Sequence, residues 1–166
     1  APLTAFAQAP AAAPAPAPPP APLLVPNPTY TTVILELDVN KPAAAAWAKF
    51  GKYCDIAKWL AMQSCTISSG VEGELASVRV LNGTIIEPLI AKTPLSYTYT
   101  QPVRVGVPFN AYHATLEARP VTATTSKIVY TFVYDNSMLA DDAARAADHQ
   151  QGFTGTAALR HAQPVE

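Results

Sequence analysis

The sequence predicts an α+β fold in which a seven-stranded antiparallel sheet curls around a long C-terminal helix, with two short helices after the first strand. Three observations support this prediction. An alternating strand pattern precedes two short helical patterns, six short segments rich in Val, Ile, Thr and Tyr come next, and an Ala-rich helical pattern ends the chain. A sheet with one apolar face needs a cover, and the terminal helix can supply it.

Length and composition indicate one domain, residues 29–166, preceded by an Ala/Pro-rich extended tail, residues 1–28. The tail holds ten of the seventeen prolines, and no charged residue precedes Glu36, so the tail cannot build a packed core. We expect it to adopt the polyproline II conformation and to span roughly 85 Å when fully extended. It would serve as a linker or dock on a neighbouring subunit.

The charge and hydropathy patterns exclude two classes of protein. The net charge is −1 and there is no basic cluster, so the sequence lacks the electrostatic footprint of a nucleic-acid-binding protein. No apolar run reaches the ~18 residues that a membrane span needs. We therefore expect a soluble protein with neither nucleic acid nor a membrane span among its partners.

Two features suggest a secreted or periplasmic protein. The stretch Ala5–Ala9 resembles the small-residue end of a cleaved signal peptide, although a chain trimmed for expression would look the same. Cys54 and Cys65 could form a disulfide that closes a loop of ~12 residues and contributes roughly 3 kcal/mol. The alternative is a pair of reduced, buried thiols.

The first elements are a strand and a helix. Apolar residues at every second position predict a half-buried strand over residues 30–40. Pro42 suits the first turn of a helix that carries Trp47. Gly51 can end this helix.

A second short helix and six strands follow. The helix is expected over residues 55–61, with Asp55 as its N-cap and Trp59 on its inner face. Asn82-Gly83 is the signal for a two-residue hairpin turn. The six strands are expected at residues 64–68, 75–81, 84–92, 95–102, 110–119 and 126–135.

The last predicted element is the long helix, from Asp141 to about Ala162. Gly152 and Gly155 predict a bend or break near Phe153.

This order of elements resembles the START-like, or helix-grip, superfamily, which includes polyketide cyclases/dehydrases, birch-pollen-type allergens and plant abscisic-acid receptors. The resemblance covers roughly residues 30–162 and rests on short motifs in the expected order. They are the first-helix tryptophan in Trp47–Phe50, the lead-in Gln63–Thr66, the glycine loop and strand Gly70–Arg79, the stretch Ile85–Leu89 and the strand Asn110–Leu116.

The resemblance implies an apolar cavity with an inward-facing glutamate, here Glu87, but it has limits. Pro88 stands where the hormone receptors carry an arginine, and Gln63 lies near the position of their ligand-binding lysine. No copy of their gate and latch loops is present. Hormone sensing is therefore not implied.

The sequence pattern, apart from the resemblance, also indicates that Glu87 faces the interior. A two-residue turn at Asn82-Gly83 would place Glu87 on one face with Val78, Val80, Ile85 and Leu89. A carboxylate there must be paired, hydrogen-bonded or protonated. Glu87 is therefore a structural glutamate, a ligand contact or an acid/base.

Further candidates for the cavity wall come from strand alternation. Asn110 and Tyr112 share one face, whereas His113 points to solvent. Tyrosines in such a wall supply apolar area and a polar group, although ordinary core packing would explain them equally well. The candidate ligand-binding residues are Glu87, Tyr112, Asn110, Tyr99, Tyr130, Phe132 and Trp59.

The opposite face of the predicted hairpin is unusually aliphatic. Leu81, Ile86 and Ile90, together with Arg79 and Pro88, would look away from the cavity, so we expect a partner there, such as a second copy of the chain. Pro88 removes a strand donor and predicts a sheet edge or a bulge at its position.

No pattern indicates a cofactor, a metal or a known catalytic motif. The glycines are too few for a phosphate or dinucleotide loop, and the three histidines lack metal-ligand spacing. Asp141 and Asp142 fit a helix N-terminus and not a catalytic pair.

Three functions remain. The first is a secreted binding module for a small apolar ligand of the lipid, sterol or aromatic polyketide class. The second is a self-assembling extracellular subunit that uses the tail. The third is a cyclase/dehydrase-type enzyme with Glu87 as acid or base and Tyr112 or Tyr99 orienting a carbonyl.

Overall fold

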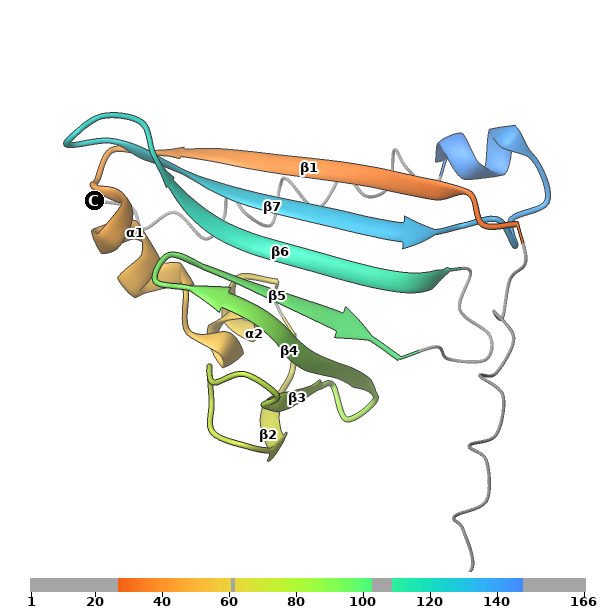
Figure 1. Ribbon diagram of the computed structural model, residues 1–166, viewed down its shortest axis with the longest axis horizontal. Helices are drawn as coiled ribbons and strands as arrows, with labels where there is room; N and C mark the ends of the chain where they lie inside the picture. Colours follow the sequence, from red (N-terminus) through yellow and green to blue (C-terminus); the bar gives the residue numbers. More distant parts are fainter. Residues whose placement is uncertain (1–26, 61, 103–108, 148–166) are drawn as a thin grey trace, which may run out of the picture.

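The computed structural model describes residues 27–60, 62–102 and 109–147 (Figure 1). Most of the predicted tail, residues 1–26, lies outside these residues. Of the predicted long C-terminal helix only residues 141–147 are described, and residues 142–147 are helical. None of the helices in the described ranges is long and apolar enough to cross a membrane.

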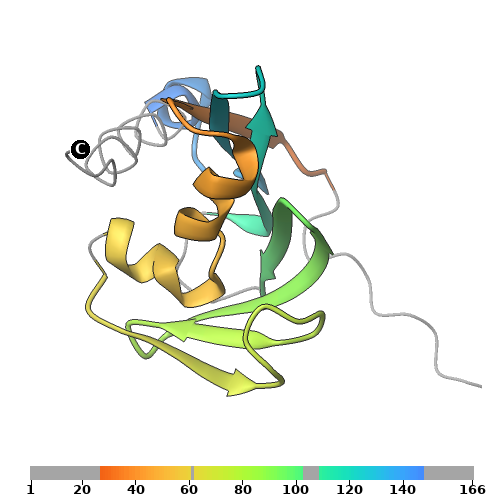
Figure 2. The same ribbon diagram turned by 90° about the vertical axis from the view of Figure 1, so that its left-hand side faces the viewer.

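The predicted seven-stranded antiparallel sheet is confirmed. Its strands lie in the order β1-β7-β6-β5-β4-β3-β2, so that every neighbouring pair except β1 and β7 is consecutive in the chain. In Figure 2 the helices α1 and α2 lie between the two ends of the curved sheet. The strands are β1 Tyr30–Val39, β2 Cys65–Ser69, β3 Val78–Leu81, β4 Ile85–Thr93, β5 Ser96–Gln101, β6 Asn110–Pro120 and β7 Ser126–Asp135.

Strand β1 has the alternation that the sequence predicts. Val33, Leu35 and Leu37 are buried against the core, whereas the residues between them are exposed. The start of β1 is tied to the end of β7, because the Thr29 N–H donates to the Asp135 carboxylate at 2.8 Å. Burial alone would raise the pKa of Asp135, but hydrogen bonds, first that from Ser137, lower it overall.

Helix α1, Ala43–Phe50, follows Pro42 as predicted and packs against β6 and β7. Gly51 ends the helix, and its N–H donates to the Trp47 carbonyl at 2.7 Å. The backbone of Gly51 is not left-handed, with φ −83°. Glycine is needed for space, since a Cβ would lie 2.4 Å from the indole ring of Trp47.

The second helical segment is shorter than predicted. A 3₁₀ turn η1, Tyr53–Asp55, leads into helix α2, Ile56–Trp59. Asp55 occupies the predicted N-cap position of α2, but its side chain makes no capping hydrogen bond. Its carboxylate instead lies 2.7 Å from the ammonium group of Lys58.

The turn between β3 and β4 contains one residue more than predicted. Asn82 and Gly83 have positive φ of 48° and 71°, as the predicted turn requires. The Thr84 N–H donates to the Leu81 carbonyl at 3.1 Å. The ladder nevertheless begins with Leu81 opposite Ile85, so Thr84 is left outside the pairing.

This change of register corrects the predicted faces of β3. Glu87 pairs with Arg79, and both are buried together with Leu81. The prediction that Val78 and Val80 share the inner face was wrong, because shifting a strand by one residue moves each side chain to the other face. For the same reason, the prediction that Arg79 and Leu81 face outward was wrong.

The outer face of β4 is partly as predicted. Ile86 and Ile90 remain 44% and 48% exposed, while Leu81 is 1% exposed and cannot contribute to a partner surface. Pro88 lies on an inner strand and not at an edge, and the pairing with β5 becomes irregular just after it, between Leu89 and Ala91.

A bulge at the start of β6 interrupts another predicted alternation. Ala111 has φ 47°, and the register with β7 shifts between Asn110 and His113. Tyr112, Ala114 and the later residues follow the predicted phase, and His113 is exposed as predicted. Asn110 is out of phase with Tyr112 because an extra residue lies between them.

Aromatic rings form a continuous row through the core. Trp47 contacts Tyr97 with 5.6 Å between ring centroids, and Tyr97 contacts Tyr99 at 6.4 Å. Tyr99 contacts Tyr112 at 6.2 Å, and Tyr112 lies 6.0 Å from Phe132. The row connects helix α1 to the middle of the sheet.

Candidate functional site

A cavity of about 170 Å³ lies on the inner face of the sheet. The sheet supplies most of its wall, and the segment between the two cysteines supplies the rest through Ile56, Leu60 and Met62. Apolar side chains dominate the wall. The described lining residues are Leu35, Ile56, Leu60, Met62, Leu81, Ile85, Glu87, Tyr99, Gln101, Tyr112, Tyr130 and Phe132.

The structure brings five of the seven candidate binding residues together. Glu87, Tyr99, Tyr112, Tyr130 and Phe132 all line the cavity. These positions agree with the predicted wall, while a role in binding stays a prediction.

The other two candidates are placed differently. Asn110 is not among the described lining residues, because the bulge at Ala111 takes it out of phase with Tyr112. It pairs instead with Asp135 of β7. The side chain of Trp59 lies outside the described part of the structure.

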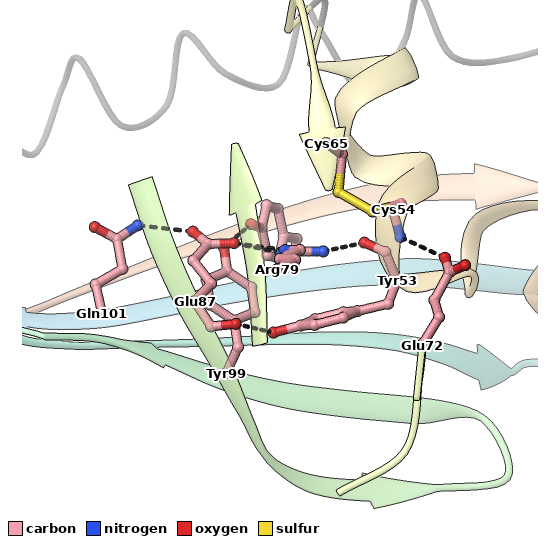
Figure 3. A network of polar contacts seen from close by, with 9 residues as sticks. Tyr53, Cys54, Cys65, Glu72, Arg79, Glu87, Tyr99 and Gln101 are labelled. Atoms are coloured by element: carbon pink, nitrogen blue, oxygen red, sulfur yellow. Dashed lines mark hydrogen bonds and ion pairs between the residues drawn. A yellow bond between two sulfur atoms is a disulfide. The ribbon is translucent and has the colours of Figure 1, made fainter. Parts of the chain in front are cut away.

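Glu87 is held by an ion pair with Arg79, as Figure 3 shows. Arg79 Nε donates to Glu87 Oε2 at 2.7 Å, and Arg79 Nη2 lies 2.6 Å from the same oxygen. Gln101 Nε2 donates to the other oxygen, Oε1, at 2.8 Å. An inward Glu87 was predicted to be paired, hydrogen-bonded or protonated. The structure shows it paired with Arg79 and hydrogen-bonded to Gln101.

Arg79 is fully buried between aromatic rings. The carbon of its guanidinium lies 4.0 Å from the centroid of Tyr53 and 4.6 Å from that of Tyr99. Burial alone would lower the pKa of Arg79, but its interactions with Tyr97 and Glu87 raise it overall, so the group stays charged. Ring faces attract a cation, which adds to the attraction of the carboxylate.

Tyr53 links this pair to the disulfide-closed segment. Its hydroxyl donates to the Glu87 carbonyl at 2.7 Å, and its own carbonyl accepts from Arg79 Nη1. The next residue, Cys54, forms the predicted disulfide with Cys65, whose Cα lies 5.6 Å away. The Cys54 N–H donates to the Glu72 carboxylate at 3.0 Å (Figure 3).

Three tyrosine hydroxyl groups complete the polar part of the wall. Tyr99 and Tyr130 are hydrogen-bonded to each other through their hydroxyls. Burial raises the pKa of Tyr99, Tyr130 and Tyr112, and an interaction with Tyr99 offsets part of the shift at Tyr112. The phenols therefore stay protonated at neutral pH and can donate hydrogen bonds.

Sequence reasoning missed Arg79 and Gln101. Two signals could have found them. Opposite charges favour direct cross-strand pairing, and placing Arg79 against Glu87 gives the observed register. Gln101 lies two residues after Tyr99, which puts it on the same face.

The comparisons with known proteins agree on the fold. A family model described as "Polyketide cyclase / dehydrase and lipid transport" matches residues 30–159. No curated protein matches the chain in sequence.

Three solved structures illustrate the structural similarity. A protein from Thermobifida fusca has 21% identity and a TM-score of 0.62, covering 78% of this chain and 91% of its own. Norcoclaurine synthase from Thalictrum flavum, in complex with dopamine and hydroxybenzaldehyde, has 14% identity and a TM-score of 0.60, covering 81% and 84%. Major latex-like protein 151 from Panax ginseng has 14% identity and a TM-score of 0.56, covering 81% and 99%. At these identities the likeness concerns the fold alone.

Proposed function

Because this chain belongs to the polyketide cyclase/dehydrase and lipid transport family, we propose that it is a binding module that encloses a small apolar ligand. The observation that carries the proposal is the cavity of about 170 Å³ with a mainly apolar wall and a few polar groups on one side. Ligand pockets generally have this composition, in which apolar area supplies affinity and a few polar groups orient the ligand.

The cavity size narrows the class of ligand. A protein cavity of about 150 Å³ lined by apolar side chains is known to bind benzene. The described cavity therefore suits one aromatic ring, or an aliphatic portion of similar size, better than a whole sterol. An aromatic compound fits best, because the rings of Tyr112 and Phe132 face the same space.

An acid/base role for Glu87 is less well supported. A buried guanidinium stabilises the charged carboxylate, whereas a general acid must be protonated. Two hydrogen bonds, from Arg79 to one carboxylate oxygen and from Gln101 to the other, further stabilise the charged form. We therefore do not propose an enzyme.

The disulfide between Cys54 and Cys65 supports a second part of the proposal, namely that the protein works outside the cytoplasm. Disulfides persist in oxidising compartments and are rare where glutathione keeps thiols reduced. Thiol labelling of the protein at the moment of cell lysis would test this, and we expect neither cysteine to be labelled. Labelling of both would contradict it.

The test of binding compares two substitutions on neighbouring residues of β4. Ile85 lines the cavity, whereas Ile86 is 44% exposed on the other face of the sheet. Ile85→Trp should fill the cavity and abolish binding of toluene, followed by NMR shifts of the lining residues. Ile86→Trp adds the same side chain outside the cavity and should bind toluene like the unchanged protein.

Native mass spectrometry of the unreduced protein completes this test. A bound molecule of up to roughly a few hundred daltons, lost in Ile85→Trp only, would support the proposal and allow the ligand to be identified. A ligand-free protein that also fails to bind toluene would overturn it.

A further inference from the structure

The polar side of the cavity contains a charge pair whose two members are not equally accessible. Glu87 is among the lining residues, whereas Arg79 is not. Glu87 therefore borders the cavity, whereas Arg79, at 0% exposure, does not. Glu87 is also the one charged residue in the described part of the lining.

The positive charge of Arg79 is already used within the wall. Its Nε and Nη2 face Glu87 Oε2, its Nη1 donates to the Tyr53 carbonyl, and its plane lies against the rings of Tyr53 and Tyr99. These contacts surround the guanidinium inside the protein, and Nη2, which is fully buried, makes its ion pair with Glu87 without a hydrogen bond of its own. A ligand in the cavity cannot reach this cation without displacing Glu87.

An anionic ligand would therefore meet an unfavourable environment. Its carboxylate would lose its water and lie next to the carboxylate of Glu87, with no accessible cation among the described lining residues to compensate. Burying an unpaired charge is costly, and a like charge nearby increases the cost.

A neutral ligand that carries a hydrogen-bond donor would meet the opposite situation. Carboxylate and side-chain carbonyl oxygens each accept more than one hydrogen bond. On this wall Glu87 Oε1 accepts from Gln101 Nε2 at 2.8 Å, and a carboxylate oxygen can accept a second hydrogen bond, so a hydroxyl or N–H group beside it would meet a charged acceptor. Hydrogen bonds to a charged acceptor are stronger than those between neutral groups.

From this arrangement we propose that the cavity selects uncharged aromatic molecules bearing a hydroxyl or N–H group and rejects carboxylic acids of the same size. The inference rests on the proposed binding function and assigns its ligand class. Arg79 and Glu87 together determine the selectivity: Glu87 faces the ligand, and Arg79 holds Glu87 in its charged form.

Three single-ring probes of similar volume test this selectivity: toluene, phenol and benzoate. Their dissociation constants for the oxidised full-length protein would be measured at pH 7 by NMR titration. Phenol should bind about tenfold more tightly than toluene, the factor expected from one hydrogen bond to a charged acceptor. Benzoate should bind at least about tenfold more weakly than phenol.

A substitution that places a cation in the wall should reverse the rejection. Gln101→Lys puts an ammonium group beside Glu87 while leaving the buried pair with Arg79 intact, and it should increase the affinity for benzoate about tenfold. Ile86→Lys adds the same charge on the outer face and should leave the preference for phenol unchanged.

The outcomes separate this inference from the binding proposal itself. If toluene, phenol and benzoate all fail to bind, the proposed function is wrong. If toluene binds but benzoate binds as tightly as phenol, or phenol binds no more tightly than toluene, the proposed function stands and the selectivity is wrong. The comparison of probes on the unchanged protein decides this even if Gln101→Lys does not fold.

Discussion

At the scale of single residues, the pair of Arg79 and Glu87 is the most demanding feature of the molecule, because both charges lie out of water at 0% and 2% exposure. Each depends on the other, since an isolated buried charge is far less stable than a paired one. The wall of the cavity and the core of the fold therefore share the same residues.

This dependence gives a prediction for stability. Arg79→Met keeps the length of the side chain but leaves Glu87 as an unpaired buried carboxylate, so the free energy of unfolding should fall by about 3–5 kcal/mol. Urea unfolding monitored by circular dichroism would measure the change.

The control is the double variant Arg79→Met with Glu87→Leu. It removes both charges and should recover a large part of the lost stability, because neither member is left alone. A loss below about 1 kcal/mol in Arg79→Met would show that water reaches the carboxylate.

The same residues show how far single positions could be predicted. Glu87 was correctly placed inside, because strand alternation on β4 determines its face. Arg79 was placed outside, because the prediction assumed the shortest turn at Asn82-Gly83, whereas Thr84 adds a residue outside the ladder. Turn length depends on how the whole hairpin packs against the rest of the protein, and the local sequence alone does not determine this packing.

At the scale of elements, the segment closed by Cys54 and Cys65 is the least regular part of the cavity wall. Its helix α2 has four residues, and the backbone bonds of Leu60 and Met62 go to Ile56 and Ala57 of the same segment. Local bonds of this kind do not attach a segment to the sheet. The disulfide does, because Cys65 is the first residue of β2, and the Gln63 N–H adds a hydrogen bond to Asn82 Oδ1 in the turn after β3, at 2.9 Å.

Reduction of the disulfide should therefore loosen this segment first. We expect the free energy of unfolding to fall by about 3 kcal/mol, the estimate for a closed loop of this size. Hydrogen exchange should accelerate at Leu60 and Met62 before it does at Leu116 of β6.

The double variant Cys54→Ser with Cys65→Ser provides a matched comparison, because it removes the bond without a reductant. It should reproduce both effects. Uniform acceleration across the sheet would contradict the idea that the bond acts on this one segment.

The elements themselves were largely predictable. Alternation predicted β1, and short segments rich in Val, Ile, Thr and Tyr between turn residues predicted the other six strands. Pro42 and Gly51 marked the limits of α1. The exceptions include the bulge at Ala111, the 3₁₀ turn η1 and the extra residue in the turn between β3 and β4, and each involves one or a few residues. Such irregularities depend on tertiary contacts, for example the Tyr53 carbonyl that accepts from Arg79.

At the scale of the whole molecule, the sheet curls so that α1 and α2 lie between its ends (Figure 2). The predicted tail and most of the predicted last helix lie outside the described residues. A self-associating surface that includes the tail and the exposed Ile86 and Ile90 therefore stays a prediction.

Deleting residues 1–26 tests the role of the tail in the intact protein. Because the described residues of the cavity lining fall between residues 35 and 132, we expect the truncated protein to bind toluene with unchanged affinity. Any self-association mediated by the tail should disappear, and analytical ultracentrifugation would measure it.

Ile86→Ser, which removes an exposed apolar side chain from β4, separates the two parts of the predicted surface. Self-association that survives the deletion but not this substitution would assign the contact to the sheet. Loss of toluene binding on deletion would instead make the tail part of the cavity.

The row of aromatic rings from Trp47 to Tyr112 also has an optical consequence. Neighbouring rings in this row have centroids no more than 6.4 Å apart. At this separation, the excitation energy absorbed by a tyrosine is transferred efficiently to an indole. Emission from Trp47 should therefore report on events at Tyr112 in the cavity. With Trp59→Phe removing the other indole, the protein carries its own fluorescent sensor and needs no attached dye.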